Sequence, residues 1–190
     1  GSGLDDWGAT LGEWGSTLVA GGAFTHASGL AAGGIASWNG ATWSPVGQGV
    51  SRSDGVTPVV YAIEQFHGSL VAGGDFDKAD GAQARRLATW DGSMWREVGG
   101  GVDGSFSQTS PRVQDLLVDG PYLTVCGIFY TSGDSTTNYV ARWDGERWHP
   151  LGWGVQMANT AQGGAWALGL FDGGLFVGGN IINAGGKPSS

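Results

Sequence analysis

A six-residue pattern, Trp-[Asn/Asp]-Gly-x-x-Trp, occurs three times in this chain and constrains its fold more than any other feature. The copies begin at Trp38, Trp90 and Trp143, so successive starts lie 52 and 53 residues apart. Asn-Gly or Asp-Gly between two apolar segments is the strongest short-range signal for a β-hairpin, because tight turns that match strand twist need positive φ at their central residues. Each copy therefore predicts two antiparallel strands.

A second pattern has the same period and predicts two more strands in each repeat. It is a Leu followed by apolar residues and usually Gly-Gly, and its four copies begin at Leu18, Leu70, Leu123 and Leu175. Seven residues before these leucines stand Leu11, Ile63, Leu116 and Leu168, all apolar. A repeat of about 50 residues with four strand signals is typical of a β-propeller blade. We therefore expect an all-β chain of four-stranded blades.

The repeat also predicts how the chain is divided. The units span approximately residues 5–50, 51–102, 103–155 and 156–190, the last one incomplete, and together form a single propeller segment over residues 1–190. Pro45 and Pro150 fall in the expected fourth strand, and proline is confined to edge strands, so this strand should lie at the edge of its sheet. About three and a half blades are present, whereas propellers usually close with four to eight. We expect a part of a larger propeller.

Small residues and tryptophans indicate how the blades pack. Glycine in a strand marks close approach by another group. We expect Trp38, Trp90 and Trp143 to pack between blades over the glycine pairs of the second strands. Cys126 stands where the other repeats have glycine, which indicates a small buried position and no reactive thiol. It is the only cysteine, so there is no internal disulfide.

The charge of the chain argues against two classes of partner. There are 9 Lys and Arg against 17 Asp and Glu, a formal net charge of −8. A surface of this sign repels phosphate groups, so nucleic acid and anionic membrane are poor partners. No apolar run approaches the roughly 20 residues that span a bilayer, which argues against membrane insertion.

The repeats resemble those of the kelch and galactose-oxidase-like propellers. They are most similar to repeats of the form Leu-x-x-Gly-Gly-x-Phe…Trp-Asp-Gly-x-x-Trp from secreted or surface-attached bacterial proteins and fungal cell-cortex proteins. The resemblance covers essentially the whole chain and implies a scaffold or interaction surface at an extracellular or cell-surface location. The copper site of galactose oxidase needs Tyr, His and a Cys-linked Tyr, and none of these can be placed here.

Few residues suggest a metal or catalytic chemistry. Asp75, Asp77 and Asp80 are a weak candidate for Ca²⁺, because hard cations bind clustered oxygens. The cluster occurs in one repeat only, and a solvated loop is the alternative. The three histidines fall at different repeat positions, so they predict no metal set. The sequence names no catalytic residue; it favours a non-enzymatic protein and leaves enzyme activity open.

Two classes of connection are expected to be long and to share one face of a propeller, where binding residues are held by a rigid scaffold. They are residues 25–34, 77–86 and 130–139 after the second strands, and 51–59, 103–112 and 156–164 between blades. Our binding candidates are Arg52, Asp54, Arg85, Arg86, Asp103 and Arg112, with Asp77 and Lys78 on the same face and Trp7 and Trp153 near it. Each tryptophan either stacks on a sugar or anchors a protein partner, or else fills a gap between blades.

Three functions remain open from the sequence. The first is a structural or interaction module that binds protein or glycan at this face. The second is a carbohydrate-binding or carbohydrate-active propeller enzyme, which needs two or three Asp or Glu side chains within about 5–10 Å of one another. The third is an assembly subunit joined through blade edges to further blades of the same chain or to another copy, because an unpaired strand edge is a template for association. Two copies of this segment do not complete each other simply, since both supply the inner strand pair.

Overall fold

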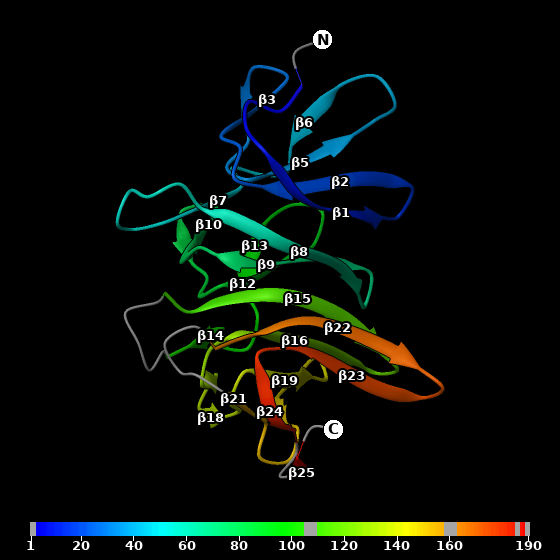
Figure 1. The fold of residues 1–190 in the computed structure, drawn as a ribbon. Coiled ribbons are helices and arrows are strands. Elements are labelled where there is room, and N and C mark those ends of the chain that lie inside the picture. The colour runs from blue at the N-terminus through cyan, green and yellow to red at the C-terminus, as the bar shows by residue number, and fades with distance from the viewer. Residues whose placement is uncertain (1–2, 105–109, 158–162, 185–186, 189–190) are drawn as a thin grey trace. The chain divides into compact units, whose positions relative to one another are not determined.

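The computed structural model describes residues 3–104, 110–157, 163–184 and 187–188, and every regular element in them is a β-strand. The predicted all-β class is confirmed. The chain divides into two compact units, Gly1–Val98 and Gly99–Ser190, called unit 1 and unit 2 below (Figure 1). Within the described residues, no helix is long and apolar enough to span a membrane.

Unit 1 contains two four-stranded antiparallel sheets with the same strand order. The first is β1 (Gly8–Trp14), β2 (Thr17–Gly22), β5 (Ile35–Trp38) and β6 (Trp43–Pro45), and the second is β8 (Val59–Phe66), β9 (Ser69–Asp75), β12 (Leu87–Trp90) and β13 (Trp95–Glu97). In both sheets the Trp-[Asn/Asp]-Gly-x-x-Trp pattern forms the hairpin between the last two strands, and its two tryptophans are paired across it.

Unit 2 repeats this order once and then shows a shorter sheet. Its four-stranded sheet is β15 (Arg112–Asp119), β16 (Tyr122–Ile128), β19 (Val140–Trp143) and β20 (Trp148–Pro150), and its two-stranded sheet is β22 (Ala165–Phe171) and β23 (Gly174–Gly179). Pro45 and Pro150 lie in the edge strands β6 and β20, as predicted, because an edge strand tolerates the missing N–H of proline.

The connections expected to be long loops after the second strands are instead built as short hairpins. Unit 1 has β3 (His26–Ala27) with β4 (Leu30–Ala31), and β7 (Val50–Ser51) with β10 (Lys78–Ala79) and β11 (Ala82–Gln83). Unit 2 has β14 (Val102–Asp103), β17 (Thr131–Ser132) and β18 (Ser135–Thr136), then β21 (Val155–Met157), β24 (Ile181–Ala184) and β25 (Lys187–Pro188). Residues 105–109 and 158–162 of the connections expected between blades lie outside the described residues.

The turns of these small hairpins follow from their sequences. Ser28-Gly29 and Asp80-Gly81 both have positive φ at each residue. In the first turn, φ is 50° at Ser28 and 82° at Gly29. In the second turn, φ is 49° at Asp80 and 77° at Gly81. Asp-Gly and Ser-Gly meet this requirement because glycine has no Cβ and aspartate tolerates the left-handed region. Although the surrounding sequences differ, the turn chemistry is shared, so these connections fold alike.

Two of the three tryptophans predicted to pack on glycine, Trp90 and Trp143, do so, but on a different glycine from the one predicted. Trp90 is 9% exposed and lies over Gly47, two residues after the end of β6, the fourth strand of the first sheet. In unit 2, Trp143 covers Gly99 in the same way. The inner glycine Gly21 faces Val60 and Ile63 instead. The large ring packs on backbone beyond the end of the strand, whereas the inner glycine Gly21 leaves room for aliphatic side chains of the next sheet.

In two of the hairpins the second tryptophan adds a directed contact. Trp95 is 4% exposed and its indole N–H donates to the carbonyl of Val46 at 2.9 Å, and Trp148 donates to the carbonyl of Gly99 at 2.8 Å. Leaving such a buried carbonyl unpaired costs about 1–3 kcal/mol. Cys126 is fully buried, as predicted, and burial raises the pKa of its thiol.

Candidate functional site

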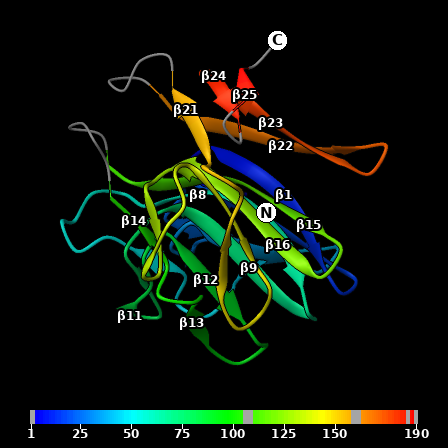
Figure 2. The same cartoon turned by 90° about the horizontal axis from the view of Figure 1, so that it is seen from below.

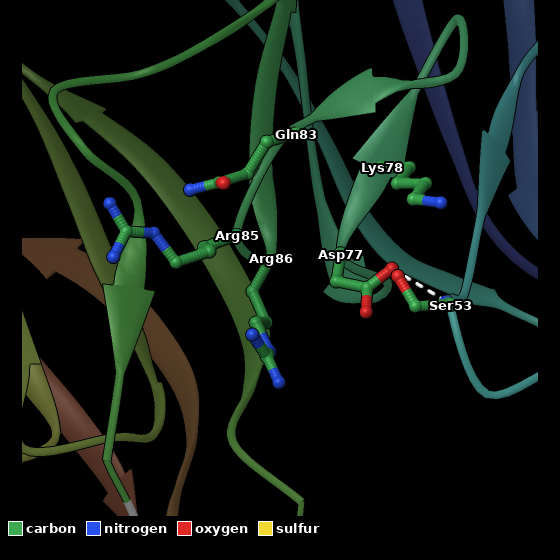
Figure 3. A pocket seen from close by; sticks show the side chains of 6 residues that line it. All are labelled: Ser53, Asp77, Lys78, Gln83, Arg85 and Arg86. Atoms are coloured by element: carbon green, nitrogen blue, oxygen red, sulfur yellow. Dashed lines mark hydrogen bonds between the residues drawn. The ribbon is translucent and has the colours of Figure 1, made fainter.

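A pocket with a volume of about 290 Å³ opens on unit 1 between three segments (Figure 3). One segment follows β7, the second is the β10–β11 hairpin, and the third leads from β11 to β12. The lining residues are Ser53, Asp77, Lys78, Gln83, Arg85 and Arg86. Two of the predicted binding residues, Arg85 and Arg86, thus lie together with Lys78 and Asp77 from the same expected face.

Backbone hydrogen bonds hold the three segments together. β7 pairs with β10, and the carboxylate of Asp77 accepts a hydrogen bond from the amide of Ser53 at 2.8 Å, drawn in Figure 3. The amide of Ala84 donates to the carbonyl of Asp77 at 2.9 Å. At the tip of the hairpin, Asp80 accepts hydrogen bonds from the amides of Gln48 at 2.7 Å and Trp95 at 3.2 Å. The walls are therefore fixed by the fold and need no ligand to form.

The pocket is cationic although the chain is acidic. Lys78, Arg85 and Arg86 carry three positive charges, and Asp77 has the only carboxylate among the lining residues. The whole chain has a formal net charge of −8. The Nε of Arg85 donates to Glu97 at 3.2 Å, which orients that guanidinium and leaves its side chain 39% exposed. An anion entering the pocket would meet the ammonium group of Lys78 from the hairpin and the guanidinium groups of Arg85 and Arg86 from the segment that follows it.

Arg86 is held in an unusual backbone conformation. Its φ is 64°, in the left-handed region that side chains other than glycine seldom adopt. The surrounding strands hold it there, because its amide donates to Phe76 and its carbonyl accepts from Gly74, both at 3.0 Å. The equivalent residues Gly34 and Tyr139 also have positive φ, 77° and 69°, so this conformation belongs to the repeat and is not specific to the pocket.

Two other predicted residues of unit 1 form an ion pair beside the pocket. Arg52 donates to Asp54 at 2.5 Å and also pairs with Asp75. The hydrogen bond from Arg52 is the main cause that lowers the pKa of Asp54 to about 2. The side chain of Arg52 is only 15% exposed, so this pair supports the loop and does not line the pocket.

The predicted aromatic residues and the candidates of unit 2 lie elsewhere. Trp7 is 51% exposed and its ring centre is 6.4 Å from that of Tyr61. Trp153 is 82% exposed in the described chain. Arg112 lies 6.0 Å from the ring centre of Trp166. Asp103 accepts a hydrogen bond from the amide of Gly104.

The structure gives separate partners to the carboxylates considered for Ca²⁺. Asp75 forms an ion pair with Arg52, and Asp77 accepts a hydrogen bond from the amide of Ser53. Asp80 accepts hydrogen bonds from the amides of Gln48 and Trp95. Among the described residues, no group of three or more His, Cys, Asp or Glu has an arrangement suited to a metal ion. Asp80-Gly81, part of the sequence first considered as a calcium loop, is a hairpin turn.

Ser53 and Gln83 are pocket residues that the sequence analysis did not select. Neither type of residue has a chemical signature of its own. Residues 77–86 were expected to form a long loop, whereas the Asp80-Gly81 turn closes a hairpin that places Gln83 across from Lys78, with which it is paired in register.

Comparison with known proteins adds no assignment. No protein-family model matches the chain, and no curated protein matches its sequence.

Proposed function

We propose that this chain is a segment of a β-propeller with four-stranded blades that serves as a non-enzymatic interaction module outside the cell or on its surface. Three sheets with the same strand order, two of them with a proline in the outer strand, support the blade assignment. Within each unit, residues of two successive sheets share one apolar core, the packing expected of neighbouring blades. The resemblance to kelch and galactose-oxidase-like repeats supports the same architecture and location.

The cationic pocket is the single observation that supports a particular ligand class. A cavity of about 290 Å³ is large enough for one sugar ring. Guanidinium groups bind carboxylate and sulfate through paired hydrogen bonds, and the amide of Gln83 and the hydroxyl of Ser53 are suited to sugar hydroxyls. The module therefore binds an acidic sugar residue, a uronate or a sulfated sugar, of a surface glycan.

The test is a titration with matched oligosaccharides. A galacturonate oligomer and a neutral galactose oligomer of equal length are added to the 190-residue chain, and binding is measured by calorimetry. We expect the acidic oligomer to bind and the neutral one to bind about tenfold more weakly or not at all, since one charged hydrogen bond contributes about 1.5–3 kcal/mol.

Two pocket variants and one matched control locate the site. Lys78→Gln and Arg85→Gln should each weaken binding of the acidic oligomer about tenfold or more. Arg96→Gln removes the same charge from unit 1 at an exposed residue that pairs with Asp91 outside the pocket, and should leave binding unchanged. Equal binding of both oligomers, or equal loss in all three variants, would overturn the proposal.

The same samples separate a binding module from an enzyme. A glycosidase of the usual type needs two carboxylates flanking the scissile bond, and Asp77 is the only carboxylate among the residues that line this pocket. We expect the oligomer to be recovered intact after incubation. Release of new reducing ends by the chain, lost in an Asp77→Asn variant, would show a carbohydrate-active enzyme instead.

A further inference from the structure

Unit 2 has an open apolar groove beside its two-stranded sheet. Its volume is about 390 Å³. The apolar side chains that form its wall come from β19, β21, β23, β24 and the segment after β20, and are Val140, Leu151, Val155, Leu175, Val177 and Ala184. No charged side chain lines it among the described residues.

The wall of this groove is the same structure that forms a buried core in unit 1. Each of its six residues has a counterpart 105 positions earlier in the sequence, and the counterparts are Ile35, Val46, Val50, Leu70, Ala72 and Ala79. All six counterparts belong to one hydrophobic cluster and are at most 5% exposed. The groove in unit 2 is therefore lined by the counterparts of residues that in unit 1 are buried in a hydrophobic core.

In unit 1 the cover is the tryptophan hairpin. Trp90 stands opposite Leu70 and Ala88 opposite Ala72 in the pairing of β12 with β9. Trp95 completes the cover and bonds to the carbonyl of Val46.

The uncovered wall in unit 2 is correspondingly exposed. β23 pairs with β22, and among the described residues no third strand pairs with its other edge (Figure 2). Leu70 and Ala72 are fully buried, whereas their counterparts Leu175 and Val177 are only half-buried. Ala184 is exposed, although its counterpart Ala79 is 1% exposed. An apolar wall beside an unpaired edge leaves both side chains and backbone groups without partners.

We propose that this groove accepts a β-hairpin of the Ala-x-Trp-[Asn/Asp]-Gly-x-x-Trp pattern from a further polypeptide segment. The three hairpins of this type in residues 1–190 already close their own sheets. The first strand of the incoming hairpin pairs with β23, its alanine opposite Val177 and its first tryptophan opposite Leu175. Its second tryptophan donates its indole N–H to the carbonyl of Leu151, the counterpart of Val46. The proposal is independent of the sugar site in unit 1.

The test uses a hairpin that the chain itself provides. A peptide with the sequence of residues 86–99 is closed head to tail, so that the hairpin exists before binding. It carries a fluorescent label and is titrated with the 190-residue chain while anisotropy is recorded. We expect saturable binding, and on hydrogen exchange we expect the amides of residues 175–178 to become protected. A cyclic peptide with both tryptophans changed to alanine should bind about tenfold more weakly or not at all.

Two variants of β23 define where the peptide binds. Val177→Arg places a charge on the groove wall and should weaken binding about tenfold or more. Phe176 lies on the same strand but faces away from the groove, and it is 58% exposed. The Phe176→Ser variant should therefore bind the peptide as the parent chain does.

Three results would overturn the proposal. The first is absence of binding by the closed peptide at millimolar concentration. The second is equal binding by the parent chain and Val177→Arg. The third is a parent chain with a native mass of two copies and a Val177→Arg variant with a native mass of one copy. The occupant of the groove would then be a second copy of this chain.

Discussion

At the scale of single residues, the packing of an indole ring on a bare backbone recurs in both units. Trp90 lies on Gly47 and Trp143 on Gly99, and both glycines have positive φ, 62° and 55°. Glycine is required there for two separate reasons. The backbone conformation disfavours a side chain, and the ring occupies the space that a Cβ would need. The chain also offers a glycine at which only the first reason applies.

Gly99→Ala and Gly120→Ala separate the two reasons. Gly120 has φ 59°, close to that of Gly99, but a Cβ there would meet no atom within 4 Å. Both variants incur the left-handed strain, about 1–2 kcal/mol. Gly99→Ala must in addition displace the rings of Trp143 and Trp148, which should cost about 1–3 kcal/mol more. Urea unfolding followed by tryptophan fluorescence measures both values, and equal losses would show that Trp143 does not depend on Gly99.

At the scale of elements, the three hairpin turns are stabilised by the side chain that begins each turn. Asn39 accepts hydrogen bonds from the amides of Ala41 and Thr42, both at 2.9 Å. Asp91 accepts from the amides of Ser93 and Met94, and Asp144 from those of Glu146 and Arg147. The geometry is the same, but only the two carboxylates titrate.

The acid sensitivity of the hairpins follows from this difference. Hydrogen bonds from Ser93, first from its hydroxyl, and then from the Met94 amide hold the pKa of Asp91 well below its ordinary value of about 3.9. When the pKa of a carboxyl group is lower in the folded state than in the unfolded state, the group stabilises the fold fully at pH values above its unfolded-state pKa. This contribution is lost as the pH falls toward the folded-state pKa. Stability from Asp91 is therefore complete above about pH 4 and decreases progressively below it.

Exchanging amide and carboxylate between the hairpins tests this directly. Asp91→Asn should show a smaller fall in melting temperature between pH 6 and pH 3 than the parent chain, and Asn39→Asp a larger one. Asp91→Asn also gives up the ion pair with Arg96, so a slightly lower melting temperature at pH 6 is expected. Identical pH profiles for the three proteins would show that these turns do not contribute to acid unfolding.

The sequence predicted the strands well because their signals are local. The hairpin tryptophans, the apolar positions before Leu18 and its equivalents, and the edge prolines each depend on a few neighbouring residues. The small sheets around Asp80-Gly81 were missed because their strands are two residues long and show no periodicity. The pocket was predicted only in part, since pairing of β7 with β10 brings Ser53 to Asp77 across 24 residues of sequence.

At the scale of the whole molecule, the balance between charge and exposed apolar surface governs association. The formal charge of −8 produces repulsion between copies at neutral pH, and the sequence isoelectric point is about 4.5. Large apolar side chains are exposed in both units, among them Leu11 at 67%, Phe171 at 74% and Trp153 at 82%. Repulsion between copies therefore opposes contacts that these side chains would favour.

Self-association should accordingly peak near the isoelectric point while the chain is still folded. The turn carboxylates retain their stabilising effect above about pH 4, so pH 4.5 removes the net charge before acid unfolding begins. Dynamic light scattering between pH 3.5 and 8 should show the largest particles near pH 4.5, with unchanged far-ultraviolet circular dichroism, and the particles should dissociate on return to pH 7. If scattering rises only where the dichroism signal is lost, the unfolded chain is the associating species and net charge is not what keeps the folded chain dispersed.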